Sequence, residues 1–140
     1  MKRIFVLFLL IIMATGGINA QAIRQKDRWG RELFYVDGQT IHQKNRFGDK
    51  LFYLDGNVVR QKNRWGSRLY YMDDNVVRQK NRWGAALLYF DGNTIRRKDR
   101  WGRALYYLDG NVLRIKDRWG AAVYYFEEVP EMWVIASIIL

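Results

Sequence analysis

Pairs of basic residues recur along the chain with a spacing that could create a binding surface. A lysine and an arginine, separated by one Asn or Asp, appear six times at intervals of 18 residues. The potential of many such cations adds up, so the stripe would attract phospholipid head groups, lipopolysaccharide or another anionic envelope polymer. The candidate ligand-binding residues are Lys26, Arg28, Lys44, Arg46, Lys62, Arg64, Lys80, Arg82, Lys98, Arg100, Lys116 and Arg118.

Five further arginines precede these pairs and would complete a basic belt on a closed fold. The alternative is that the belt is only a solvated outer face, with its arginines paired to aspartates in neighbouring turns. The five residues are Arg24, Arg60, Arg78, Arg96 and Arg114.

Catalytic chemistry is not expected from this sequence. The single histidine, His42, stands where other copies have arginine, and beyond the first twenty residues serine occurs only at Ser67 and Ser137, so no triad can be assembled. There is no cysteine, which excludes disulfides, thiolate zinc sites and a cysteine nucleophile. We expect no catalytic residue, cofactor or metal. A ring of calcium ligands is the weaker alternative for the recurring aspartates Asp37, Asp55, Asp73, Asp91 and Asp109.

An aromatic residue followed by glycine recurs in the same register, so one 18-residue unit is used six times and determines the fold. Large rings bury much apolar area, and we expect these positions, with the tryptophan of the tail, to form the structural core. They are Trp29, Phe47, Trp65, Trp83, Trp101, Trp119 and Trp133.

Each unit is typical of a β-hairpin. In the third copy, residues 58–65 alternate between polar and apolar positions, which predicts a strand with Arg60, Lys62 and Arg64 on its wet face. After a turn at 66–68, a second strand is predicted over 69–72.

An Asp-Gly turn then leads into the next copy, because Asp-Gly suits a two-residue hairpin turn. With Asp-Gly at the centre of the turn, Met72 would lie opposite Asn75 and Tyr70 opposite Val77. This register places Tyr70, Met72, Val77 and Trp83 on one face.

Six copies predict an all-β fold of twelve short antiparallel strands. The first and last copies carry no polar cap, so we expect the first strand to pair with the last and close a shallow barrel. The tail after Pro130 is apolar almost all round and predicts a short helix that plugs this barrel. An anchor that dips into a membrane is the alternative.

The first twenty residues have the charged, apolar and small-residue regions of a secretory signal. The domain organisation expected is therefore a signal peptide at 1–20, a six-repeat barrel at 21–128 and an apolar helix at 129–140. Removing Lys2 and Arg3 lowers the formal net charge from +10 to +8. We expect a periplasmic or secreted protein, not anchored through a lipidated cysteine, and export argues against a nucleic-acid partner.

The repeat Lys-(Asp/Asn)-Arg-Trp-Gly…Leu-Tyr-Tyr-x-Asp-Gly-Asn, with its Pro-x-x-Trp apolar tail, resembles the bacterial β-flower proteins. The resemblance implies a shallow barrel of hairpin petals, similar to tubby-like domains and phospholipid scramblases, in which an apolar C-terminal helix threads a twelve-stranded barrel. It implies no established function. The function expected is a non-enzymatic binding or structural module for anionic lipid or envelope polymer. The alternatives are an envelope assembly protein that docks a protein or apolar ligand, and a carbohydrate-binding cell-wall repeat module.

Overall fold

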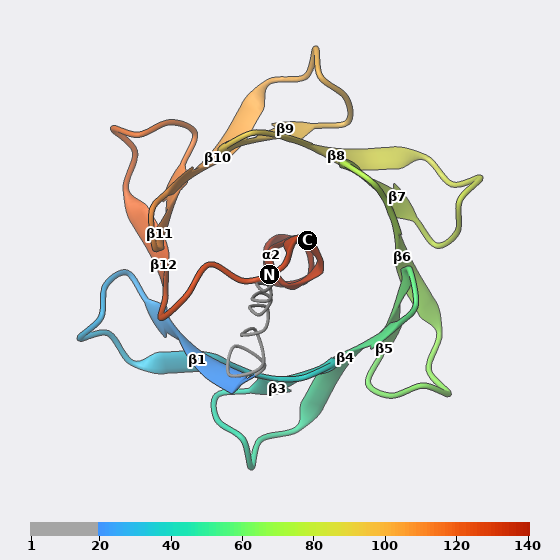
Figure 1. Ribbon diagram of the computed structural model, residues 1–140, viewed down its shortest axis with the longest axis horizontal. Coiled ribbons are helices and arrows are strands. Elements are labelled where there is room, and N and C mark those ends of the chain that lie inside the picture. Colours follow the sequence, from blue (N-terminus) through green and yellow to red (C-terminus); the bar gives the residue numbers. More distant parts are fainter. Residues whose placement is uncertain (1–19) are drawn as a thin grey trace, which may run out of the picture.

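A computed structural model describes residues 20–140, so the predicted signal segment, Ala20 excepted, lies outside the described residues. Twelve antiparallel strands form one closed barrel in which each strand pairs with its neighbours in sequence. This confirms the predicted all-β architecture (Figure 1). The strands are β1 (Ala20–Gln25), β2 (Glu32–Asp37), β3 (Thr40–Gln43), β4 (Lys50–Asp55), β5 (Val58–Gln61), β6 (Arg68–Asp73), β7 (Val76–Gln79), β8 (Ala86–Asp91), β9 (Thr94–Arg97), β10 (Ala104–Asp109), β11 (Val112–Ile115) and β12 (Ala122–Phe126).

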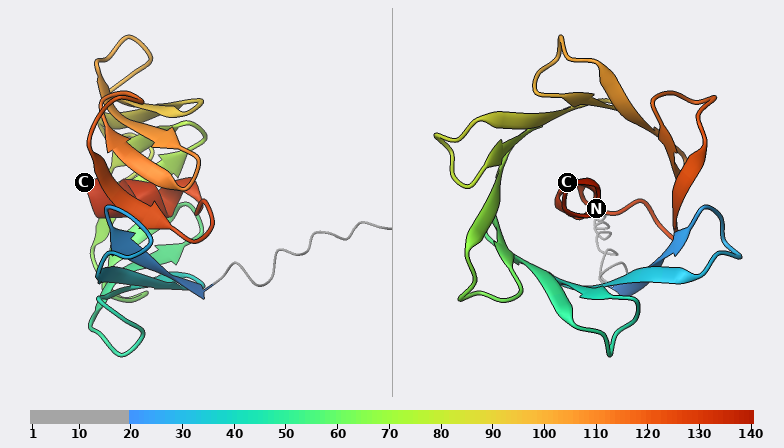
Figure 2. Two further views of the ribbon diagram at one scale, coloured as in Figure 1. Left: turned by 90° about the vertical axis from the view of Figure 1, so that its left-hand side faces the viewer. Right: turned by 180° about the vertical axis from the view of Figure 1, so that it is seen from behind.

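Two kinds of connection alternate around the barrel and define its two rims. Since the strands are antiparallel and consecutive, the longer loops all leave one rim and the two-residue turns all leave the other. We call the longer loops petals and the two ends of the barrel the petal rim and the turn rim. In Figures 1 and 2 the petals project outward from the ring. The petals comprise residues 26–31, 44–49, 62–67, 80–85, 98–103 and 116–121.

The turn rim is built from two-residue turns, but each turn is centred one residue later than predicted, which shifts the strand pairing by two residues. Met72 pairs with Val77, not Asn75, because the turn is centred on Asp74 and Asn75. The first central residue adopts a positive φ, 65° at Gly56 and 52° at Asp74, a conformation that Gly adopts freely and Asp tolerates.

The strand that enters each petal is shorter than predicted. β5 ends at Gln61, and Lys62 adopts a φ of 70°, which turns the chain out of the sheet. The equivalent lysine in every copy has a φ between 68° and 71°. Lys62 and Arg64 therefore belong to a petal and not to the wet face of a strand.

Gln21 helps to join the first strand of the barrel to the last. β1 pairs with β12, and beside this seam the buried amide of Gln21 donates to the carbonyl of Glu128 at 2.9 Å. Its oxygen accepts the backbone N–H of Glu127 at 2.9 Å. The closure is thus held by side-chain hydrogen bonds as well as by the strand ladder, and none of the twelve described strands has an unpaired edge.

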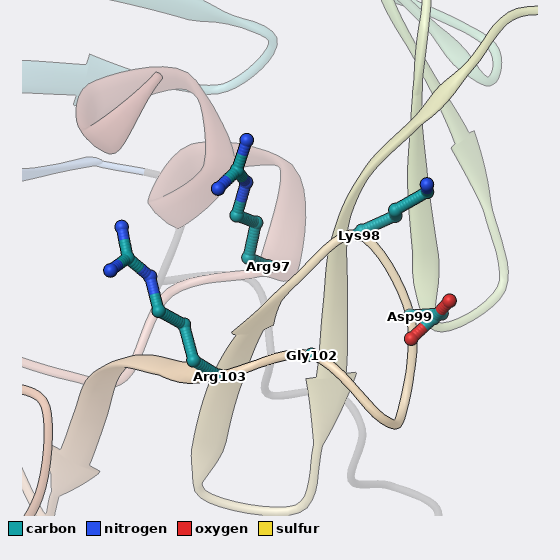
Figure 3. Close-up of a pocket in the computed structure, with 5 residues that line it drawn as sticks. All are labelled: Arg97, Lys98, Asp99, Gly102 and Arg103. Atoms are coloured by element: carbon teal, nitrogen blue, oxygen red, sulfur yellow. The ribbon is translucent and has the colours of Figure 1, made fainter.

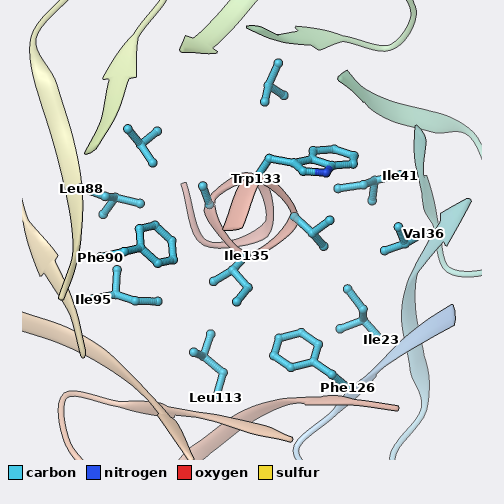
Figure 4. Packing of buried hydrophobic residues seen from close by; sticks show 14 residues of the cluster. Ile23, Val36, Ile41, Leu88, Phe90, Ile95, Leu113, Phe126, Trp133 and Ile135 are labelled. Carbon is cyan, nitrogen blue, oxygen red and sulfur yellow. The ribbon is translucent and has the colours of Figure 1, made fainter. Parts of the chain in front are cut away.

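Helix α2 (Met132–Ile139) lies inside the barrel and fills its centre (Figure 4). The chain leaves β12 at the turn rim, and the hydroxyl of Tyr124 donates to the carbonyl of Ile138 at 3.4 Å, so α2 runs towards the petal rim. Trp133 and Val134 are almost fully buried against one inward residue from each repeat. Those residues are Ile23, Ile41, Val59, Val77, Ile95 and Leu113.

The plug was predicted because a helix that is apolar all round must be buried, and a twelve-stranded barrel is too wide for its own side chains to fill. The membrane-anchor alternative is therefore wrong for this arrangement, since the apolar surface of α2 is already covered. Between residues 20 and 140, the structure has no helix of the length and apolar character that would cross a membrane.

Candidate binding surface on the petals

Each petal is a tight loop whose sequence is dictated by its hydrogen bonds. In the third copy the side-chain Oδ1 of Asn63 accepts the backbone N–H of Trp65 at 2.9 Å, and its carbonyl accepts the N–H of Gly66 at 2.8 Å. Asn or Asp is needed there because a short side-chain acceptor can satisfy an N–H two residues on. Gly66 is needed because a Cβ would lie 1.6 Å from the carbonyl oxygen of Gln61.

This loop carries the repeated aromatic rings outward, which corrects the prediction that they form the core. The six rings are 79–84% exposed, and among the predicted core aromatics only Trp133 is buried. The physical reason is the positive φ of the preceding lysine, which ends the strand before the alternation can turn the ring inward. The exposed rings are Trp29, Phe47, Trp65, Trp83, Trp101 and Trp119.

An arginine guanidinium packs over every one of these exposed rings. The distance from the guanidinium carbon to the ring centroid is 4.6 Å for Arg82 on Trp83 and 5.1 Å for Arg46 on Phe47. The other four petals have the same contact at 4.9–5.0 Å. A cation over a ring face is attracted by the ring quadrupole, so the contact holds both side chains at the petal tip.

All twelve candidate binding cations lie on the petals, at one rim of the barrel, and are exposed. The lysine begins the petal and the arginine precedes the aromatic ring, so each petal presents an ammonium, a guanidinium and an aromatic face together. The structure thus brings the predicted candidates to one rim, although through loops and not through a strand face.

The second set of arginines has a different place. Arg60 donates from Nε to Oδ2 of Asp55 at 2.9 Å and from Nη1 to the carbonyl of Gly66 at 3.1 Å. Arg78, Arg96 and Arg114 repeat both contacts. These side chains are half-buried and link a turn to a petal, which agrees with the alternative that they pair with turn aspartates.

Two copies modify this linkage. Arg24 keeps the contact to the carbonyl of Gly30 and meets Glu32 at 3.4 Å instead of a turn aspartate. His42 keeps only the contact to the petal carbonyl, with its Nδ1 3.0 Å from the carbonyl oxygen of Gly48. His42 is therefore explained by its structural position. Four of the five aspartates considered as calcium ligands, Asp37 being the exception, are occupied by arginine.

The two rims differ sharply in charge. The petal rim carries the twelve cations described above, and the turn rim collects most of the acidic residues. The carboxylates at the turn rim and in the segment that leads to α2 are Asp37, Asp55, Asp73, Asp74, Asp91, Asp109, Glu127, Glu128 and Glu131. The molecule is thus polarised along the barrel axis, with its positive end at the petals.

Neither the exposed rings nor this polarity was predicted from the sequence. The signal that could have revealed the rings is the run Asn-Arg-Trp-Gly, in which an Asx residue and a glycine bracket the ring and indicate a tight loop.

Within residues 20–140, no group of three or more His, Asp or Glu side chains could hold a metal ion. Comparison of the chain with protein-family models, curated proteins and solved structures gave no match.

Proposed function

We propose that this protein is an exported, non-enzymatic binding module whose petal rim attaches to an anionic lipid surface or envelope polymer. The proposal extends the resemblance to β-flower proteins, since the closed barrel, the petals and the central helix agree with that architecture. Fold alone assigns no function, so the argument depends on the petals themselves.

The observation that carries the proposal is the repeated tip at which a solvent-exposed ring and a guanidinium are held together. Large exposed rings leave apolar surface in water, and six of them at corresponding positions indicate an interaction surface. Tryptophan favours the boundary between an apolar and a wet phase, and arginine binds phosphate and carboxylate groups with planar, paired hydrogen bonds. Five of the six tips, that of Phe47 being the exception, therefore combine the two features that recognise a lipid head-group region.

The polarity of the barrel supports the same orientation. An anionic surface would attract the petal rim and repel the turn rim, so the molecule would approach with its petals first. Each basic residue near such a surface contributes about 1 kcal/mol, and salt weakens the attraction.

Co-sedimentation with lipid vesicles tests the proposal. Binding of the mature protein should increase with the fraction of anionic lipid and decrease steeply as salt is added. Equal partitioning to neutral and anionic vesicles would contradict it. In a Trp133→Phe background, only petal tryptophans report by fluorescence among the described residues, so a blue shift on binding should come from the tips.

A charge-reversal variant shows whether the petals carry the binding. Changing Lys62, Arg64, Lys80 and Arg82 together to Glu alters two adjacent exposed petals, so the fold should persist while anionic-vesicle binding falls sharply. As a control, Asp74→Lys with Glu127→Lys raises the net positive charge at the opposite rim. If net charge alone drives binding, the control should bind more strongly than the parent protein.

The exposed indole rings also favour a second candidate, binding to a glycan of the cell envelope, in which sugar rings would stack on the free ring faces. Pull-down with a neutral insoluble polysaccharide distinguishes the two. Glycan binding should persist at high salt and depend on the rings, whereas binding to anionic vesicles should depend on the cations.

A further inference from the structure

One repeat departs from the others at the mouth of the barrel. In every copy the last residue of the strand entering a petal donates its N–H to the carbonyl of the last petal residue, at 2.8–2.9 Å. In the fifth copy these two residues are Arg97 and Arg103. The same positions elsewhere hold at most one cation, in the pairs Gln25–Arg31, Gln43–Asp49, Gln61–Ser67, Gln79–Ala85 and Ile115–Ala121.

The backbone hydrogen bond places the two arginines next to each other, and their side chains extend in the same direction (Figure 3). Arg97 pairs with Leu88, whose side chain is buried inside the barrel, so Arg97 lies on the inner face at the petal rim. Figure 3 shows the side chains of Arg97 and Arg103 extending to the same side of the loop, while Lys98 and Asp99 point away from them. The two residues line an open pocket of about 430 Å³.

Neither guanidinium has a partner within residues 20–140. The ion pairs of this part of the chain involve other arginines, and no side-chain hydrogen bond uses Arg97 or Arg103. Asp99, which also lines the pocket, uses its Oδ1 to accept the N–H of Trp101. Because both guanidinium groups extend to the same side of the loop (Figure 3), their like charges repel each other, and an anion placed between them would relieve that repulsion.

We propose that Arg97 and Arg103 form a discrete binding site for a phosphate group, one per barrel. Two guanidinium groups can each form paired hydrogen bonds to the oxygens of one phosphate, which a single petal cation cannot do. The group could be a free phosphate ester or the head of a phospholipid. The site does not depend on the proposed attachment through the petals, since a soluble phosphate could bind here even if no membrane does.

The repeat supplies a matched variant for the test. Arg97→Gln with Arg103→Ala gives the fifth copy the residues that the fourth copy has at Gln79 and Ala85, so the fold should be unaffected, as circular dichroism would verify. The control variant Lys50→Gln with Arg68→Ala also removes two exposed cations, which lie at the start of β4 and β6 and belong neither to this site nor to the twelve petal cations. Inorganic phosphate, glycerol 3-phosphate and a soluble short-chain phosphatidic acid serve as probes.

Arginine Nε signals in ¹⁵N NMR titrations report binding at each side chain. Phosphate should shift the Arg97 and Arg103 signals with one-site saturation, and the matched variant should bind at least about tenfold more weakly, the loss of one charge-assisted hydrogen bond or more. The control should bind as the parent does. Tighter binding of short-chain phosphatidic acid than of glycerol 3-phosphate would identify a lipid head group as the ligand, and equal affinities a soluble phosphate ester.

The reverse exchange provides a second, independent readout. Gln79→Arg with Ala85→Arg should create a second site and raise the stoichiometry from one phosphate to two. The proposal is overturned if the matched and control variants weaken binding equally, or if phosphate shifts all arginine signals alike. It is also overturned if the matched variant loses thermal stability while phosphate has no effect on the parent, because the two arginines would then serve the fold and not a phosphate site.

Discussion

Arg60 joins the turn rim to a petal through its 2.9 Å ion pair with Asp55 and its hydrogen bond to the petal carbonyl of Gly66. The same side chain thus connects the turn and the petal that lie at the two ends of β5. Because the arginine is half-buried, it can hold this geometry with less competition from water than a fully exposed pair.

His42 replaces the arginine in the second copy and forms no ion pair with any described residue, and we predict that His42→Arg stabilises the protein. The new guanidinium could pair with Asp37, as Arg60 pairs with Asp55, and keep the contact to the carbonyl of Gly48. A gain of about 0.5–1 kcal/mol in the free energy of unfolding is expected, measured by urea denaturation. In the double variant with Asp37→Asn the gain should largely disappear. A gain that persists there would show that the ion pair is not its cause.

Petal glycines should resist substitution more strongly than turn glycines. In Gly66→Ala the added Cβ would collide with the carbonyl of Gln61, so the petal must rearrange, at a cost well above the ~1 kcal/mol of an ordinary Gly→Ala change. The control is Gly56→Asp, which reproduces the residue found at the equivalent turn position, Asp74, and has open space around it. It should cost about 1 kcal/mol or less. Thermal melts of both variants measure the difference, and equal losses would contradict the prediction.

Tryptophans of the helix and of the petals should differ in their effect on stability. Trp133 is 4% exposed, so Trp133→Ala should cost about 3–5 kcal/mol through lost burial and the cavity left in the barrel. Trp65→Ala should cost at most about 1 kcal/mol, because it removes only an exposed ring and its arginine contact. Denaturant unfolding of the two variants compares them directly.

Deletion of residues 133–140 should have the larger effect expected from loss of the whole plug. Inward residues such as Ile23 and Val77, fully buried in the intact protein, would then face water. We expect a poorly folded chain that aggregates, seen as loss of the cooperative thermal transition. A deletion variant that melts as the full chain does would show that the barrel is stable without α2.

Alkaline pH should destabilise the barrel from about pH 10 upwards. Burial raises the pKa of the Tyr70 hydroxyl, and burial, with a smaller contribution from Tyr106, raises the pKa of Tyr124. Between the unfolded and folded pKa values the folded state binds more protons, so stability falls as pH rises through this window and is unaffected below it. In Tyr70→Phe with Tyr124→Phe, melting temperatures between pH 8 and 11 should fall less steeply than in the parent.

The sequence predicted the hairpins, the closure and the plug because these depend on features that repeat or extend over many residues. The alternation of Tyr70, Met72 and Val77 places them on the inner face even though the predicted pairing was displaced by two residues, because a shift of two leaves every side chain on the same face. The plug follows from the uniformly apolar tail alone. Both conclusions tolerate small local errors.

The position of the rings could not be predicted in this way, because one backbone angle decides it. Residues 58–65 alternate as a single strand would. The left-handed conformation of Lys62 nevertheless turns the chain out of the sheet, so that Trp65 points into solvent and not into the barrel. A periodicity argument cannot detect one such residue, and lysine is not a residue type that favours a positive φ. The candidate cations were therefore identified correctly as exposed, whereas the rings beside them were assigned to the wrong environment.

The closed ring fixes the petals at regular angles around one axis, which has a consequence for avidity. Once one petal holds a group on an extended surface, the others are confined near that surface, and their binding becomes an intramolecular event at high effective concentration. Petals that are individually weak would then attach the barrel firmly where groups are dense and barely at all where they are sparse. The repeat number would thereby set the surface density at which attachment begins.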